Sequence, residues 1–363
     1  MSLEVEAPVT DADPDAARAA IEHCYSRDWS DGLPLVPATR TLVDEFLATV
    51  DRDPGEVIGT LEHLHRSVTV ELAAINAAMA GCRPEYFPVV LAAWQAVQLD
   101  RSATGGGWQS TSGPSPLLVV NGPVREELGF NSAGGVFGPG FRANMTVARS
   151  MGLIVRNAFG VVPHGFEQAT QGLPGRWQVC LAENEEESPW EPMSVDGGLA
   201  AGTSAVSAML TRTVEYVDNR HTGDPEQLLA DFADTISRTG AWIFRNASAG
   251  IVFCPEHAQL LAKAGMGKAD VRAWLVERCG RSKADLARVG KDGVGDNGVR
   301  FAAGAPSDDV DPLFPGGGPQ ALPIVVAGAR NAGISTVVRV FAGWSASSVP
   351  VVGRTTPSDR SSR

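Results

Sequence analysis

The sequence predicts an α/β protein with several strand–loop–helix units around a mixed or parallel sheet. Apolar runs typical of buried strands occur at 116–123, 250–254 and 322–329. Segments with helical spacing of apolar residues come after the first two runs. The 40 glycines and 24 prolines among 363 residues indicate many shaped loops between these elements.

The first part of the chain is predicted to be mainly helical. Asp15 can cap an alanine-rich first helix, Gly81 is a typical helix end, and Pro84 suits a first helical turn. The predicted helices are 14–28, 40–51, 67–82 and 83–100.

After residue 100 strands and helices alternate. We predict strands at 116–123, 176–184, 250–254 and 322–329, and helices at 143–160, 225–240, 255–265 and 268–290. The segment 204–217 fits either a strand or a helix.

One integrated domain is expected over residues 16–350, with two lobes meeting near 195–210 as an alternative. Residues 1–15 are acidic and predicted to be flexible, and 351–363 to form a disordered tail. The Gly/Pro/Asp-rich stretch 291–320 is either a functional loop or a surface excursion.

Composition excludes several classes of protein. The net charge is −12 and no basic patch appears, which argues against nucleic-acid binding. No apolar run is long enough to span a bilayer, and the N-terminus lacks a secretory signal, so we expect no membrane association and a cytoplasmic location. Five widely spaced cysteines argue against a disulfide framework. Homo-oligomers are compatible with the sequence.

A Gly-rich stretch, "NSAGGVFGPGFRANMTVARSMG", follows the first predicted strand. Glycines allow close backbone approach, and a helix beginning near Arg142 would direct free N–H groups into the loop. The stretch matches neither a phosphate-binding P-loop nor a dinucleotide fingerprint. It predicts a site for a carboxylate or small anion, bound by Arg142 and oriented by Asn131, Ser132 and Asn144. A purely structural turn is the alternative.

Two segments each contain Cys and then Pro-Glu before an apolar helix, at Cys82 and Cys254. A helix N-terminus lowers the pKa of a nearby thiol, so either cysteine is a candidate nucleophile, with His257 as the partner of Cys254. The match also suggests a duplicated βα unit. The alternative is that both cysteines are buried and inert.

Other candidates lie in loops. Glu183 begins the acidic run "ENEEE" after a predicted strand and could act as a general base next to Trp190, or the run could be a solvated surface. His164 follows the helix after the Gly-rich loop and could return to it. Glu62, His63 and His65 could bind a divalent metal, although no further ligand is near in sequence.

Several stretches resemble a bacterial group associated with, or fused to, small thioredoxin-like UGSC-motif redox proteins. They include "WSDGLPLVPAT", "TVELAAINAAMAGCRPEYFPVVLAA", "NSAGGVFGPGFRANMTVARSMGLIVRN", "LAENEEESPWEP", "PEHAQLLAKAGMGKADVRAWL" and "PIVVAGA". The resemblance spans most of residues 28–328 and implies one integrated fold and a small redox partner protein. The Cys/Sec-Gly-Ser-Cys motif itself is absent, so the chain alone lacks a dithiol pair of that type.

Together these features predict an enzyme acting on a small polar or anionic organic molecule by lyase, hydrolase or group-transfer chemistry. No organic redox cofactor is expected. A metal-dependent enzyme and a non-catalytic binding subunit for a redox partner are the alternatives.

Overall fold

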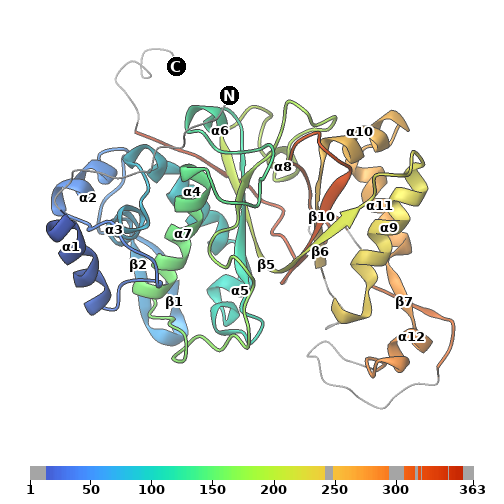
Figure 1. Cartoon of the computed structure of the whole chain (residues 1–363), viewed down its shortest axis with the longest axis horizontal. Helices are drawn as coiled ribbons and strands as arrows, with labels where there is room; N and C mark the ends of the chain where they lie inside the picture. Colours follow the sequence, from blue (N-terminus) through green and yellow to red (C-terminus); the bar gives the residue numbers. More distant parts are fainter. Residues whose placement is uncertain are drawn as a thin grey trace, which may run out of the picture.

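The computed structural model describes residues 14–241, 248–293, 306–314, 318–319, 321–341 and 343–354. The fold is α/β, as predicted, and contains a mixed seven-stranded sheet with helices on its outer face (Figure 1). The strands lie in the order β4 (Cys180–Ala182), β3 (Ser115–Asn121), β5 (Ala205–Asp218), β10 (Ile334–Val340), β6 (Ser248–Phe253) and β9 (Ile324–Val326), with β11 (Val349–Pro350) also on β5.

The two halves of the sheet repeat one arrangement. In the first half β3 is parallel to β4 and antiparallel to β5, and in the second β6 is parallel to β9 and antiparallel to β10. The halves join where β5 and β10 pair antiparallel, for example at Val214 and Val338. Antiparallel neighbours of equivalent type are related by a two-fold rotation, so the same strand arrangement occurs in duplicate within the sheet, with pseudo-two-fold symmetry.

This duplication is not the one that the cysteine segments suggest. Cys254 follows strand β6, whereas Cys82 follows helix α3 (Val70–Ala80) and its αL cap Gly81. The strand equivalent to β6 in the first half is β3, which ends at Asn121. The prediction of a βα unit duplicated at the two cysteines is therefore wrong.

The edges of the curled sheet meet. The backbone N–H of Asn184, just after β4, donates to the carbonyl of Val326 in β9 at 2.7 Å, and its side chain donates to the Gly328 carbonyl at 3.1 Å. The concave side is filled by apolar side chains that alternate along the strands with those facing the helices. They include Leu117, Val119, Leu181, Met209, Val325 and Val338.

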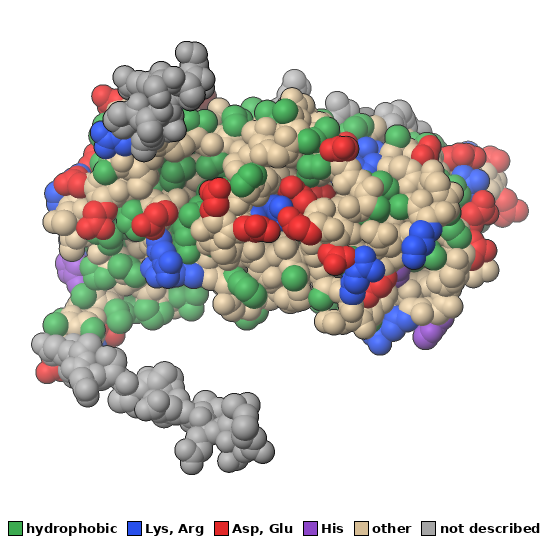
Figure 2. Space-filling model, turned by 90° about the horizontal axis from the view of Figure 1, so that it is seen from above, with side chains coloured by type: hydrophobic (Ala, Val, Ile, Leu, Met, Phe, Trp, Pro, Cys, Tyr) green, Lys and Arg blue, Asp and Glu red, His purple; other side chains and the backbone are tan. Residues whose placement is uncertain are grey.

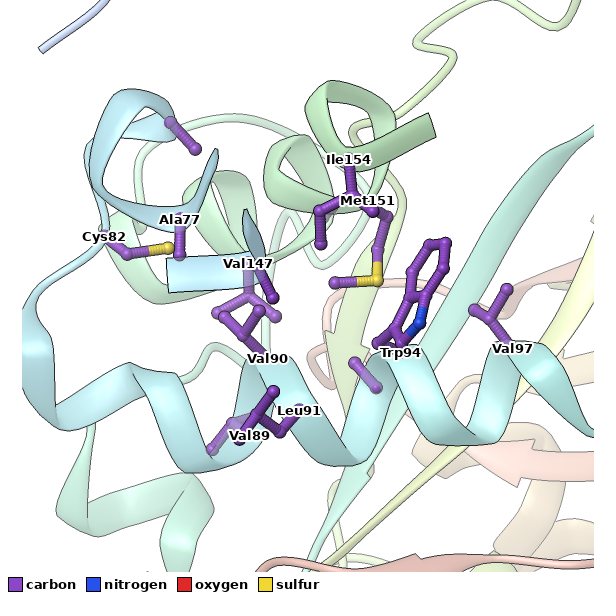
Figure 3. Packing of buried hydrophobic residues seen from close by; sticks show 14 of the residues in the cluster. Ala77, Cys82, Val89, Val90, Leu91, Trp94, Val97, Val147, Met151 and Ile154 are labelled. Carbon is purple, nitrogen blue, oxygen red and sulfur yellow. The ribbon is translucent and has the colours of Figure 1, made fainter. Parts of the chain in front are cut away.

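Helices cover the outside of each half (Figure 1). The first half has α1 (Pro14–Ser26), α2 (Arg40–Leu47), α3, α4 (Phe87–Gln98) and α7 (Arg142–Asn157). The second has α9 (Pro225–Ser237), α10 (Pro255–Lys263) and α11 (Lys268–Arg278). Figure 3 shows how Trp94 of α4 and Met151 of α7 pack together in the first-half core.

Several predicted boundaries differ from the structure. Residues 66–69 form β2 (Arg66–Thr69), which pairs with β1 (Val57–Leu61) before Thr69 caps α3. The predicted helix 268–290 is interrupted, because β7 (Gly280–Ser282) pairs with β8 (Val310–Pro312) and α12 (Lys283–Arg288) follows. The ambiguous segment 204–217 is strand β5. Short elements complete the chain: η1 (Glu62–Leu64), η2 (Pro84–Tyr86), α5 (Arg101–Thr104), η3 (Gly107–Gln109), α6 (Val124–Glu127), α8 (Met193–Asp196) and η4 (Thr239–Ala241).

The predicted C-terminal tail begins too early. Val351 donates to the Ser204 carbonyl at 2.8 Å and Arg354 to the Thr49 carbonyl at 2.8 Å, so 351–354 are held on the first half. Residues 1–13 and 355–363, and much of the predicted loop 291–320, lie outside the described residues. No helix in the described ranges has the length and apolar character needed to cross a bilayer.

Candidate functional site

Three segments that the sequence singles out converge on residues 326–328, at the carboxyl end of β9. In the Gly-rich loop (residues 131–141), the Ser132 carbonyl accepts a hydrogen bond from the Gly328 N–H at 2.8 Å. In the loop after β4, the Asn184 N–H donates to the Val326 carbonyl. The Ala327 N–H donates at 2.9 Å to the carbonyl of Phe253, the last residue of β6. Strand carboxyl ends in open α/β sheets are common ligand positions.

A cavity of about 360 Å³ lies beside this convergence, and we call it the mouth cavity. Its volume is within the range of small-molecule sites. The Gly-rich loop forms one wall, β5, β6 and β10 form another, and the turn after β9 closes a side. The lining residues are Gly135, Val136, Phe137, Gly138, Tyr216, Val252, Ala327, Gly328, Ile334 and Thr336.

The Gly-rich loop offers backbone donors. Gly135 and Gly140 have φ of +71° and +123°, conformations that side chains other than glycine rarely adopt. Gly138 donates to Gly135 at 2.6 Å, whereas among the described residues nothing accepts the N–H groups of Val136 and Phe137. The N-cap residue of α7, Phe141, supplies no side-chain acceptor. The loop therefore has the donor character expected of an anion site.

Asn131 and Asn144 hold the loop rather than a ligand. The Asn144 side chain accepts the Asn131 N–H at 2.8 Å and donates to the carbonyls of Asn131 at 3.2 Å and Cys180 at 3.0 Å. The Asn131 side chain accepts from Ala133 and donates to the Gly134 carbonyl. Both amides are buried, so the expected ligand-orienting role is replaced by a structural one.

Arg142 and His164 lie away from the mouth cavity. The exposed Arg142 side chain donates from Nε to the Gly81 carbonyl at 2.9 Å, which ties α7 to the end of α3. His164 follows the far end of α7, a helix whose 16 residues span about 24 Å. The nearby Arg66 donates to Phe159 at 2.8 Å, so this segment lies on β2. The expectation that His164 returns to the Gly-rich loop is wrong.

Glu183 is fully buried at the joint between the halves. Its carboxylate accepts from the Asn121 amide at 2.8 Å and the Met193 N–H at 2.7 Å, and lies 3.8 Å from the buried ammonium of Lys268. Lys268 also pairs with Asp196 at 3.4 Å. A carboxylate with this many fixed partners is placed to hold the two halves together.

The rest of the acidic run is also paired. Arg125 forms a bidentate pair with Glu186, at 2.7 and 3.1 Å, and its hydrogen bond holds the pKa of that carboxyl below its usual value. Glu185 accepts from the Gly122 N–H at 2.8 Å, and Glu187 pairs with Arg330 at 2.5 Å. Figure 2 shows acidic and basic side chains gathered near the middle of the upper face. The run joins neighbouring segments, and its side chains at Glu186 and Glu187 are 55% and 41% exposed, so it is both paired and partly solvated.

Trp190 belongs to the second-half core. Its indole N–H donates to the Met266 carbonyl at 3.0 Å, and its ring meets Phe253 edge to face at 5.8 Å. The loop after β4 is thereby fixed to the turn before α11. Trp190 is therefore a packing contact between the halves rather than a wall of the mouth cavity.

His257 does not form an ion pair with Cys254. Its Nδ1 lies 2.7 Å from the Ser335 hydroxyl, which also accepts the Cys254 N–H at 2.9 Å, and its Nε2 lies 2.8 Å from the Asn219 carbonyl. These contacts suit a neutral ring that donates from Nε2 and accepts at Nδ1. Burial lowers the pKa of His257 and raises the pKa of the Cys254 thiol.

Because the pKa of His257 is lowered in the folded state, stability should depend on pH. The unfolded imidazole takes up a proton near pH 6.5, above the folded value. The stabilisation is therefore complete above about pH 6.5 and is lost as the pH falls toward the folded pKa, with a slope of at most about 1.4 kcal/mol per pH unit. Urea unfolding of wild type and His257→Gln from pH 8 to pH 5 tests this. An identical slope in both proteins would contradict it.

Cys82 is a core residue. Figure 3 shows its sulfur directed toward Ala77 within the packed helices. Burial raises its pKa to about 12, although Thr146 and Arg142 oppose the shift. The lowered thiol pKa predicted for Cys82 and Cys254 is wrong, because desolvation outweighs the helix N-terminus. The two cysteines also lie in different halves.

Glu62, His63 and His65 lie on an exposed turn. His63 and Gln109 are hydrogen-bonded, and His65 adopts a left-handed conformation with φ of 51°. Within the described ranges, no three His, Cys, Asp or Glu side chains are grouped so as to hold a metal ion. Metal dependence remains a prediction from the sequence.

No family model, curated protein or solved structure matches this chain. The resemblance to proteins associated with UGSC-motif redox proteins therefore also remains a prediction.

Sequence reasoning missed much of the mouth cavity. Tyr216 and Thr336 reach it from β5 and β10, strands that were ambiguous or overlooked in the sequence. A signal was present in "ISTVVRV", whose β-branched residues favour a strand. Gly328, with φ of +107°, lies in the run "VVAGA" at the end of the predicted strand 322–329, but the observed strand β9 already ends at Val326.

Proposed function

We propose that this chain is an enzyme that binds a small polar or anionic organic molecule in the mouth cavity. The observation that carries the proposal is the Gly-rich wall, where the N–H groups of Val136 and Phe137 have no acceptor among the described residues. Backbone donors fixed in a partly enclosed site stabilise negative charge that develops on a substrate oxygen. Lyase, hydrolase and group-transfer reactions all develop such charge.

The side chains assigned to this chemistry differ from the sequence-based candidates. Of the residues that line the mouth cavity, Tyr216 has an ionisable side chain. Its phenol is our candidate proton donor. Thr336 supplies a second hydroxyl for orienting the substrate. Cys82, Cys254 and Glu183 have no part in the proposal, because they are buried and partnered elsewhere.

The test places a charge in the cavity wall. Val136→Asp should weaken binding of small hydroxy and dicarboxylic acids at least about tenfold, because a like charge next to the anion is repulsive. The matched variant Val136→Asn has the same size without the charge and should bind nearly as wild type. Ligand-detected NMR with these acids and their neutral amides provides the measurement. Equal binding by both variants would contradict an anion site here.

A further inference from the structure

A second cavity lies in the helical layer of the first half. It has a volume of about 530 Å³ and is enclosed by α1, α2, α3, the segment between α1 and α2, and the end of α7. None of its lining residues belongs to the mouth cavity. Its volume is typical of a site for an organic molecule.

The walls are largely apolar and one is aromatic. Trp29 is 38% exposed and meets the His23 ring edge to face, with centroids 5.7 Å apart. Ile75 and Met79 of α3 and Val43 of α2 add aliphatic lining. Aromatic walls of this kind favour a flat ring as the ligand.

Two amides supply polar groups to this apolar space. Asn76 is 1% exposed, donates one N–H to the Leu72 carbonyl at 2.8 Å, and accepts at its oxygen from Asn157 at 2.8 Å. Asn157 uses its other N–H on the Trp29 carbonyl at 3.2 Å. An amide has two N–H donors and one oxygen. Among the described residues, the second N–H of Asn76 and the oxygen of Asn157 have no partner, so two hydrogen-bonded lining residues keep one donor and one acceptor between them.

The arginine among the lining residues is already compensated. Arg40 lines the cavity, but its guanidinium is paired with Glu71, and Asp44 lies 3.7 Å from it. An anionic ligand would have to displace one of these carboxylates. The site therefore favours an uncharged ligand whose hydrogen-bonding edge complements one N–H and one oxygen.

We infer that this cavity binds a flat, uncharged aromatic molecule with an amide or lactam edge. The ligand carbonyl accepts from Asn76, its N–H donates to Asn157, and its ring packs between Trp29 and Met79. This inference is independent of the function proposed for the mouth cavity.

The experiment compares 2-quinolinone with quinoline, which keeps the two rings but lacks the lactam edge. Calorimetry on the full chain should show 2-quinolinone binding at least about tenfold more tightly, since quinoline has no N–H to donate to the Asn157 oxygen and offers only its ring nitrogen as an acceptor. The filled variant Ile75→Trp should abolish this binding. Tyr216→Phe, a change in the mouth cavity, should leave it unaltered.

A second readout measures binding on the wild-type protein and uses a variant only to assign a resonance. With ¹³C-methyl methionine, saturating 2-quinolinone should shift the Met79 methyl resonance, assigned with Met79→Leu. Equal affinity for the two compounds, no binding, an unshifted Met79 resonance, or full binding by a folded Ile75→Trp protein would each overturn the inference.

Discussion

Replacing Glu183 with leucine is expected to lower the free energy of unfolding by about 3–5 kcal/mol, since it removes one partner of a buried ion pair together with the acceptor of a buried N–H. Lys268 would keep only Asp196, which it shares with Arg272. The Met193 N–H would lose its 2.7 Å acceptor. Urea denaturation followed by circular dichroism measures the change.

Two controls separate structure from chemistry at Glu183. Glu183→Gln keeps a side-chain oxygen for the Met193 N–H and should be less destabilising than leucine. Glu187→Gln breaks a half-exposed pair with Arg330 and should change stability by less than about 1 kcal/mol. If Glu183→Leu were as stable as Glu187→Gln, the structural role would be refuted. The hypothesis that Glu183 is a general base would be restored by a folded Glu183→Gln protein that binds the small organic acids normally but no longer turns over a substrate that the wild type converts.

The second large effect is expected at Asn144. Asn144→Leu removes the acceptor of the Asn131 N–H and a donor to the Cys180 carbonyl, both buried. Each buried group left without a partner costs about 1–3 kcal/mol, so for two such groups we expect a loss of about 2–6 kcal/mol in unfolding free energy. Thermal or urea unfolding provides the measurement.

The position of Asn144 also predicts an effect on binding. Asn144 fixes Asn131, and Asn131 fixes the turn that leads into the Gly-rich wall. Acid binding by a still folded Asn144→Leu protein should therefore weaken along with stability. The exposed Asn331→Leu is the matched control and should alter neither. Unchanged stability of Asn144→Leu would show that the loop is held by other contacts.

The fold could be predicted where the spacing of apolar residues along a single segment is regular enough to indicate a helix or a strand. Helices 143–160 and 225–240 and the strand 116–123 correspond to α7, α9 and β3 within a few residues. The break at Gly280 could not be predicted, because β7 forms only by pairing with β8, whose residues are distant in the chain. β5 was ambiguous for the same reason, since its partners on both sides come from elsewhere.

The site was predictable only in part. The sequence indicates three segments as parts of a candidate site: the Gly-rich loop and the segments at Glu183 and Cys254. In the structure these segments converge on residues 326–328. The roles given to individual side chains were not predictable, because burial and hydrogen bonding decide them. Asn131 and His257 carry suitable groups, but the fold engages those groups internally.

The two-fold relation between β5 and β10 is the symmetry of a homodimer built into one chain. In a true homodimer of half-length chains, both ends of the paired sheet would have to be identical. A single chain is free of that constraint, and the two ends of its sheet differ. The residue that follows β9 is Ala327, which lines the mouth cavity. The equivalent residue after β4 is Glu183, whose buried carboxylate lies 3.8 Å from the ammonium of Lys268. The two ends of one pseudosymmetric sheet can therefore differ, with a cavity at one end and a buried ion pair at the other.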